Sequence, residues 1–245
     1  MKDRDFMEKL KELIKESNNI VFFGGAGVST ESGIPDFRSQ DGLYHMKYDY
    51  PPEEILSHTF FESKTKEFFK FYKDKLNCLD VKPNICHKYL EKLERDGKLK
   101  AIITQNIDGL HTKAGSKKVL ELHGSIYRNT CESCGKKYDP EIVFDKKTEI
   151  PTCSCGGIIK PDVVLYEEPL DEETISETIQ VLRNADLLIV AGTSLTVYPA
   201  SSFIHYFGGK NLVIINRDET SFDSMATLVI HDSLGNVFKY LNDSK

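Results

Sequence analysis

Four of the six cysteines stand in two close pairs, Cys131 with Cys134 and Cys153 with Cys155. Four thiolates match the tetrahedral ligand set of a structural zinc ion, and glycines beside both pairs suit the tight turns that wrap such an ion. Redox pairs and buried free thiols are the alternative interpretations. A catalytic zinc is disfavoured, because four sulfur ligands leave no coordination position for water. The spacing therefore predicts one structural zinc ion held by Cys131, Cys134, Cys153 and Cys155.

A glycine-rich turn, Gly25-Ala26-Gly27, follows a short apolar run and precedes a helical-looking segment. Glycine lets a backbone approach a pyrophosphate closely, and the amides that follow point at its charge. Thr30 occupies the place of the third glycine of the common dinucleotide fingerprint, so a tight turn without a ligand explains the turn about equally well. Pro35 ends regular helix and leaves an acid, an aromatic ring and a guanidinium on a loop over this turn. Such side chains suit an amide ring, a sugar and a phosphate, and they belong to Asp36, Phe37 and Arg38.

Polar side chains also follow a buried run at Gln105-Asn106-Ile107-Asp108, where they can hydrogen-bond ribose hydroxyls and a carboxamide. Capping of the loop by Asn and Asp is the common alternative. His123 ends another short strand, just before a glycine and the cysteine pairs. An imidazole with a pKa near ~6.5 can accept a proton from a ribose hydroxyl at neutral pH. Surface or packing roles are expected of His45, His58, His87, His205, His231, Cys78 and Cys86.

Strand and helix patterns alternate along the chain. Helical spacing of apolar residues covers 3–16, 60–76 and 84–95, and short β-rich runs cover 19–23, 100–104, 119–122, 186–191 and 211–215. This alternation is typical of a parallel sheet with helices on both faces, in which ligands bind beyond the carboxyl ends of the strands. The polar motifs follow those ends, so they should share one crevice. The sequence thus predicts an α/β, Rossmann-like fold, with a small zinc-binding module at 126–160, where the alternation stops.

The composition is that of a globular protein able to bury a core, with 40% hydrophobic and 29% charged residues. The net charge of −6, without a Lys/Arg block, argues against direct nucleic-acid binding. The charged N-terminus does not read as a signal sequence, and the longest apolar runs, such as 187–191, are too short to cross a membrane. We therefore expect a cytoplasmic protein, in which clustered cysteines hold metal rather than form disulfides.

The strings at 25–38, 104–111, 122–124 and 192–199 and the cysteine pairs occur in the order found in sirtuins. Through them the chain resembles this family, in its bacterial form, from about residue 8 to about residue 240. It departs from the family pattern at Glu167, where glycine is usual, and at Asp171, where proline is usual. Both departures fall on the loop expected to dock the substrate peptide.

The resemblance implies a Rossmann-like NAD-binding domain at 1–125 and 161–245, with the zinc module inserted at 126–160. Residues of about 35–80 are expected to supply the helical part of the small domain. NAD would bind between the two parts as a co-substrate, beside one structural zinc ion. Acetyl-lysine-bearing proteins are the implied partners, and we expect the protein to be a monomer.

The resemblance also implies roles for individual residues. The implied catalytic residues are His123, Asn106 and Asp108. After nicotinamide has left, His123 would deprotonate a ribose hydroxyl, which then attacks an alkylimidate. Water then releases free lysine and O-acyl-ADP-ribose. The acyl-lysine channel would be lined by Val163, Val164 and Leu165. Contacts to NAD are expected from Gly25, Ala26, Gly27, Thr30, Asp36, Phe37, Arg38, Gln105, Asn106, Ile107, Asp108, His123, Gly192, Thr193, Ser194, Asn216, Arg217, Asp232 and Leu234.

The expected activity is NAD-dependent lysine deacetylation. Mono-ADP-ribosylation of protein by the same site is the enzymatic alternative. The non-enzymatic alternative is an NAD-sensing module without catalysis, and the complete set of Asn106, Asp108 and His123 argues against such a module. Sirtuins that remove succinyl groups carry a tyrosine and, three residues on, an arginine. This chain has Tyr72 and Lys75 there. Because an ammonium lacks the bidentate fork of a guanidinium, we expect acetyl and other neutral acyl groups to be preferred over a desuccinylase activity.

Overall fold

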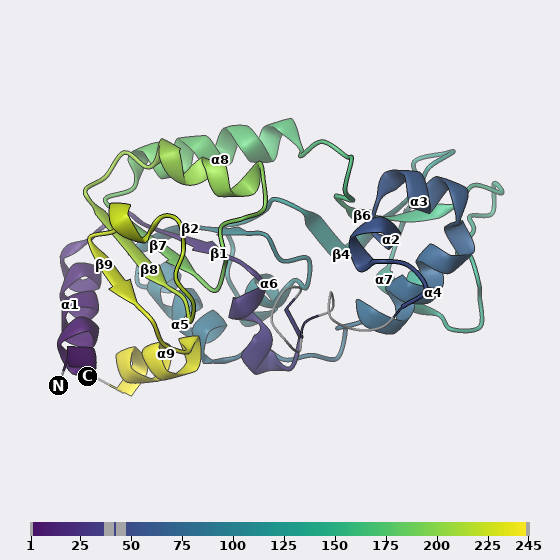
Figure 1. The fold of residues 1–245 in the computed structure, drawn as a ribbon. Helices are drawn as coiled ribbons and strands as arrows, with labels where there is room; N and C mark the ends of the chain where they lie inside the picture. The colour runs from purple at the N-terminus through teal and green to yellow at the C-terminus, as the bar shows by residue number, and fades with distance from the viewer. Residues whose placement is uncertain (1, 37–41, 43–47, 244–245) are drawn as a thin grey trace.

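The computed structural model describes residues 2–36, 42 and 48–243, and its larger part is built on a six-stranded parallel sheet (Figure 1). The strand order is β3-β2-β1-β7-β8-β9. All residues of β1 and β7 are buried, as expected for central strands of a parallel sheet covered on both faces. The predicted Rossmann-like α/β fold is confirmed. The strands are β1 (Ile20–Gly24), β2 (Leu99–Thr104), β3 (Val119–Glu121), β7 (Leu187–Ala191), β8 (Asn211–Ile215) and β9 (Leu228–Ile230).

Helices cover both faces of this sheet because successive strand residues point to opposite sides. Phe22 and Ile102 belong to one core, with apolar residues of α1, α5 and α9. Phe23 and Ile103 belong to the other core, with residues of α8 and the 3₁₀ helix η4. In Figure 1, α8 accordingly lies above the strands and α9 below them. These elements are α1 (Lys2–Glu16), α5 (Ile85–Arg95), α8 (Glu172–Asn184), α9 (Leu234–Asp243) and η4 (Ala200–Tyr206).

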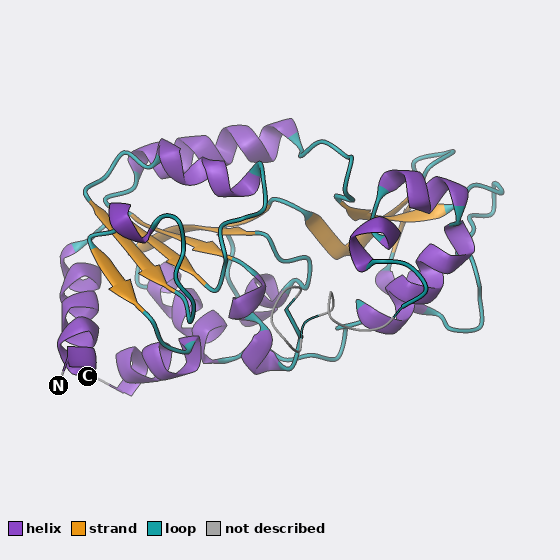
Figure 2. Cartoon of the chain, viewed as in Figure 1, coloured by secondary structure: helices purple, strands orange, loops and turns teal. Residues whose placement is uncertain are grey.

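A smaller antiparallel sheet, in the order β5-β4-β6, forms the second part of the molecule (Figure 2). Four helices share a core with this sheet, and that core is rich in aromatic side chains such as Phe61, Phe68 and Phe69. Only Leu122 and His123 separate β3 from β4, so this two-residue linker joins the two sheets. The elements are α2 (Pro52–Ile55), α3 (His58–Ser63), α4 (Thr65–Lys75), β4 (Gly124–Cys131), β5 (Lys137–Tyr138), α7 (Pro140–Phe144) and β6 (Ile159–Val163).

Two local expectations differ from the structure. The helix expected over 60–76 is two helices, because the backbone of Lys64 leaves the helical conformation (φ −136°, ψ 49°). The segment after the glycine turn forms two short 3₁₀ helices, η1 (Ala26–Val28) and η2 (Thr30–Ser32). Asn84 caps α5, and its side-chain oxygen accepts the backbone N–H groups of Cys86 and His87. Within the described ranges, no helix combines the length and the apolar character needed to cross a bilayer.

Candidate functional site

A cavity of about 820 Å³ lies at the carboxyl ends of the parallel strands and also touches the end of β6. Its volume falls within the range of small-molecule sites, about 300–1,000 Å³. Every predicted NAD and substrate residue that the structure describes lines it, whereas Phe37 and Arg38 lie outside the described residues. The predicted residues at the cavity are Gly25, Ala26, Gly27, Thr30, Asp36, Gln105, Asn106, Ile107, Asp108, His123, Val163, Val164, Leu165, Gly192, Thr193, Ser194, Asn216, Arg217, Asp232 and Leu234.

The glycine-rich turn packs directly against the end of β7. The Gly27 N–H donates to the Gly192 carbonyl oxygen at 2.8 Å, and a Cβ at position 27 would lie 2.7 Å from the Gly192 Cα. Gly192 has a φ of 59°, in the left-handed region, and a Cβ there would meet the Val28 nitrogen at 2.6 Å. The two backbones therefore require glycine at both positions, with or without a ligand. The Thr30 hydroxyl donates to the Gly27 carbonyl at 3.1 Å and closes the turn where a third glycine is missing.

Three polar side chains form a hydrogen-bonded chain beyond the end of β2. Asn106 Nδ2 donates to Ser29 Oγ at 3.1 Å, and the Ser29 hydroxyl donates to Asp108 Oδ2 at 2.6 Å. Asp108 is 5% exposed, and its Oδ1 accepts the Leu110 N–H at 2.9 Å. Burial raises the pKa of the Asp108 carboxyl, and the bonds from Ser29 and Leu110 oppose that rise. Ser29 has no motif of its own, and its place inside the 25–38 string is its one signal in the sequence.

His123 projects from the linker between the two sheets and lines the cavity. Its Nδ1 lies 2.9 Å from the Gln105 carbonyl oxygen, which can only accept, so Nδ1 carries the proton and Nε2 the lone pair. Burial lowers the pKa of His123, and the Gln105 bond opposes the shift. A neutral ring with its lone pair on Nε2 is the state that a general base requires. The Gln105 side chain in turn donates to Thr193 Oγ1 at 3.1 Å, which ties the end of β2 to the end of β7.

The segment after β6 forms an apolar wall of the cavity. Val163 and Leu165 are buried, and Val164 between them is half-buried. The Val164 N–H donates to the His123 carbonyl oxygen at 2.9 Å, so the wall and the histidine are fixed to each other through the backbone. The segment is thus part of the small core and a cavity wall at the same time, and β6 ends at Val163.

Only one of the two residues compared with succinyl-specific sirtuins reaches the cavity. Tyr72 is fully buried and stacks between Phe68 and Phe144, with ring centroids 5.6 and 5.4 Å away. Lys75 lines the cavity, and its Nζ lies 2.8 Å from an Asp74 carboxylate oxygen. Of these two side chains, Lys75 alone could therefore approach an acyl carboxylate in the cavity, whereas Tyr72 belongs to the small core.

Cys78, for which a packing or surface role was expected, is buried in the small core just after α4, and it also lines the cavity. Burial raises the pKa of its thiol to about 12. The thiol is therefore protonated at neutral pH and a poor nucleophile.

The loops after β8 and β9 bring further polar groups to the cavity. Asn216 Nδ2 donates to the Asp218 carbonyl at 2.8 Å, and Asp232 Oδ1 accepts the Ser233 N–H at 2.6 Å. Glu31, which has no sequence signal beyond its place in the 25–38 string, lines the cavity too. Its Oε1 accepts the N–H of Gly235 at 2.6 Å and so ties η2 to the first turn of α9.

The four paired cysteines converge, with all Sγ atoms within 4.8 Å of one another. The contacts run across the sequence pairs: Cys131 to Cys155 at 3.5 Å and Cys134 to Cys153 at 3.6 Å. Four sulfurs bonded to one zinc ion at about 2.3 Å lie about 3.8 Å apart in a tetrahedron, so the cluster fits this ion. None of the four lines the cavity, which agrees with a structural rather than a catalytic site.

The sequence pattern that defines the Sir2 family matches residues 25–199. An NAD-dependent protein deacetylase of Clostridium acetobutylicum is 57% identical over 238 residues, which span 96% of this chain and 97% of that protein. A protein of the same name from Clostridium perfringens is 59% identical over 237 residues, or 95% of this chain and 97% of the relative.

Solved structures match the fold over nearly its whole length. A Sir2 structure with a p53 peptide and NAD⁺ has a TM-score of 0.85 and 40% identity, and the match covers 95% of each chain. A Sir2 variant with a deacetylated p53 peptide and 3′-O-acetyl-ADP-ribose has a TM-score of 0.88 at 40% identity, over 96% of each chain. The likeness therefore includes both sheets.

Proposed function

The chain belongs to the Sir2 family, and from this premise we propose that it is an NAD-dependent protein lysine deacetylase. In this reaction the acetyl group of an acetyl-lysine side chain passes to ADP-ribose, with release of nicotinamide and O-acetyl-ADP-ribose. Relatives that span almost the whole chain carry the name of this activity. Structural neighbours hold a p53 peptide with NAD⁺ or with acetyl-ADP-ribose. Both kinds of likeness support the proposal.

The observation of this chain that carries the proposal is the state of His123. Its Nδ1 proton is held by the Gln105 carbonyl at 2.9 Å, which leaves Nε2 as the base within the same cavity as Asp108. Because burial lowers the pKa of His123, the base form is populated at neutral pH. Deprotonation of a ribose hydroxyl needs this form.

The cavity residues suit NAD. The glycines of the Gly25–Gly27 turn carry no side chain, so a pyrophosphate could approach this backbone closely. The Asn106–Ser29–Asp108 chain offers donors and acceptors for a carboxamide and a ribose. When bound, NAD supplies the ADP-ribose that accepts the acetyl group, and nicotinamide is the leaving group. Asp108 and Asn106 would orient that end of the molecule, and His123 Nε2 would take the hydroxyl proton.

The apolar wall would hold the acylated side chain. Val163, Val164 and Leu165 offer no side-chain polar atoms, so they would exclude water from the methylenes of the lysine. The zinc ion would have a structural role outside this wall. By joining Cys131 at the end of β4 to the cysteines that precede β6, it would hold these strands in register.

The proposal is tested by incubating the protein with an acetyl-lysine peptide, with and without NAD, and following nicotinamide release. We expect nicotinamide and unmodified lysine to appear in equal amounts, and only when NAD is present. NAD consumption that leaves the acetyl group on the peptide and adds ADP-ribose to protein would instead establish a mono-ADP-ribosyltransferase. No NAD consumption with any acyl peptide would refute the proposal.

A further inference from the structure

Two segments far apart in the sequence meet at the cavity: residues 56–59, which include the first two residues of α3, and residues 165–168, which follow β6. The Tyr166 N–H donates to the Leu56 carbonyl at 2.9 Å, and the His58 N–H donates to the Tyr166 carbonyl at 3.0 Å. Leu56 and all of residues 165–168 line the cavity. The junction, called here the 56–59/165–168 contact, is therefore part of the cavity wall.

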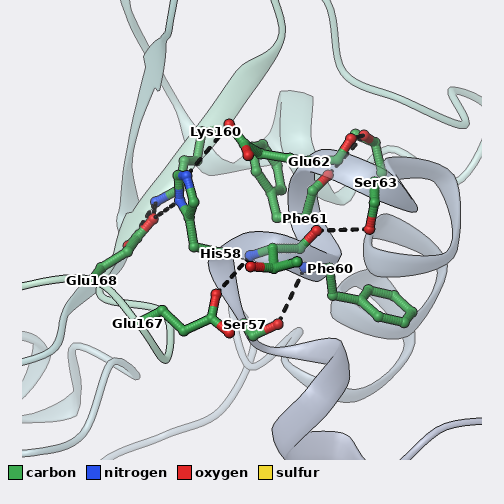
Figure 3. A network of polar contacts seen from close by, with 11 residues as sticks. Ser57, His58, Phe60, Phe61, Glu62, Ser63, Lys160, Glu167 and Glu168 are labelled. Atoms are coloured by element: carbon green, nitrogen blue, oxygen red, sulfur yellow. Dashed lines mark hydrogen bonds and ion pairs between the residues drawn. The ribbon is translucent and has the colours of Figure 1, made fainter.

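Two adjacent carboxylates reinforce this contact (Figure 3). Glu167 Oε2 accepts the Thr59 backbone N–H at 2.8 Å, which joins the loop to α3. Glu168 Oε2 accepts the Leu165 backbone N–H at 2.9 Å and lies 3.1 Å from Lys160 Nζ. Glu168 thus fixes the backbone of a wall residue, and Lys160 Nζ lies 3.1 Å from each oxygen of the same carboxylate.

Glu167 shows that the loop conformation depends on side chains. Its φ of 75° lies in the left-handed region, which glycine adopts freely and other residues rarely do. A glycine at this position would fit the backbone but would have no carboxylate for Thr59. The chain therefore keeps a strained residue that secures the 56–59/165–168 contact.

The second oxygen of Glu168 is held by His58. The distance from His58 Nδ1 to Glu168 Oε1 is 2.9 Å, and the imidazole Nε2 lies 3.4 Å from Glu62 Oε1 on its own helix. In Figure 3 the ring of His58 lies between Glu168 and α3, on the side where Lys160 approaches the same carboxylate. The side chains of Glu168 and Lys160 are only 18% and 17% exposed. Hydrogen bonds to a charged group in such a place are stronger than those at an open surface.

We propose that His58 is a positioning residue for the acylated lysine. By holding Glu168 Oε1 it keeps that carboxylate on the Leu165 N–H, and so fixes the wall against which the lysine side chain lies. Without His58, Oε1 keeps the flexible Lys160 side chain, whose Nζ lies 3.1 Å away, but loses the imidazole that fixes the rotation of the carboxylate against the Leu165 N–H. This inference rests on the proposed function, because it assigns the wall to the acyl-lysine and not to NAD.

The test compares His58→Ala with His58→Asn, whose amide N–H lies near the place of Nδ1 and can still donate to Glu168. Glu62→Gln is the matched control, since it removes the other partner of His58 and leaves Glu168 untouched. Affinity for an acetyl-lysine peptide is measured by fluorescence anisotropy without NAD. The KM values for peptide and for NAD and the melting temperature are measured on the same proteins.

We expect His58→Ala to raise the peptide Kd and peptide KM about fivefold, the effect of one lost hydrogen bond of ordinary net strength. The KM for NAD and the melting temperature should stay at wild-type values, and His58→Asn and Glu62→Gln should bind peptide like the wild type. In a Glu168→Gln background, His58→Ala should add little, because both changes act on one bond.

An unchanged peptide Kd in His58→Ala would overturn the inference. So would a parallel loss of NAD and peptide affinity with a lowered melting temperature, since that result describes a merely structural residue. The proposed function fails separately: it fails if the wild-type protein turns over no acetyl peptide, whatever His58 does to peptide binding.

Discussion

Replacing His87 by glutamine should make the stability of this protein less sensitive to acid. His87 is fully buried in α5, with its ring centroid 4.7 Å from that of His111. Burial lowers its pKa from 6.5 to about 4. Its Nδ1 accepts the Asn84 N–H at 3.2 Å, and its Nε2 has no hydrogen-bond partner within the described part of the chain. The folded protein therefore holds a neutral ring, whereas the unfolded chain carries an imidazole of ordinary pKa.

The sign of the effect follows from proton binding. Because the folded pKa is the lower one, the unfolded chain binds the proton first as the pH falls. Stability is complete above the unfolded pKa of 6.5 and is lost as the pH falls toward about 4. At about 1.36 kcal/mol per pKa unit, His87 alone removes about 2 kcal/mol between neutral pH and about pH 5. Burial and the neighbouring His87 also lower the pKa of His111, so His111 acts in the same direction.

Urea unfolding at about pH 7.5 and about pH 5 measures this difference. Glutamine at the third helical position can still accept the capping N–H but does not titrate in this range. The free energy of unfolding of His87→Gln should therefore fall less between the two pH values than that of the wild type, by about 2 kcal/mol. His205→Gln, at an exposed position, serves as the control and should behave like the wild type. An acid-induced loss in His87→Gln as large as in the wild type would refute the reasoning.

Four further outcomes are expected. His123→Ala should lower kcat about a hundredfold or more, the contribution of a general base, with unchanged NAD affinity in calorimetry; near wild-type turnover would exclude this base. Metal analysis should find one zinc per chain, and Cys131→Ala or chelation should lower the melting temperature; freshly purified protein without zinc would disprove the site. Gly27→Ala should cost about 1–3 kcal/mol in urea unfolding, since its Cβ would lie 2.7 Å from the Gly192 Cα; wild-type stability would show that this turn can relax. The kcat/KM for an acetyl peptide should be about tenfold higher than that for a succinyl peptide, because an unpaired buried carboxylate is costly. Lys75→Arg should reduce this difference in kcat/KM. Equal kcat/KM values in the wild type would show that Lys75 binds the succinyl carboxylate.

Features that depend on residues close together in the sequence could be predicted. The polar strings directly follow strands, and the ends of parallel strands meet at one edge of a sheet. The positions of these strings alone therefore predict that Gly25, Asp108 and Gly192 share one cavity, as they do. The zinc cluster could be predicted for a similar reason, because two short cysteine spacings leave few other arrangements.

Contacts across long sequence separations could not be predicted. Ser29 and Asp108 are 79 residues apart in the sequence, and Glu31 and Gly235 are 204 apart. No local pattern distinguishes a serine or glutamate that makes such a bond from one that faces water. His58 lacks a motif for the same reason, since its partner Glu168 is on the other side of the zinc module.

Tyr72 and Asp171 show what spacing and family resemblance do not reveal. Positions 72 and 75 lie on neighbouring faces of a helix, but Phe144 of α7 covers the tyrosine while the lysine reaches the cavity. Asp171, which departs from the family's usual proline, accepts the Thr174 N–H at 2.7 Å and caps α8. That departure therefore has a local explanation in helix capping.

The fate of the acetyl group tests the central claim most directly. A peptide whose lysine carries an isotopically labelled acetyl group is incubated with the protein and NAD, and the products are identified by mass spectrometry. The account predicts that the label leaves the peptide and appears on ADP-ribose, one label for each nicotinamide released, and that His123→Ala stops this transfer. Label that remains on the peptide while NAD is consumed, or that appears as free acetate without NAD, would contradict it.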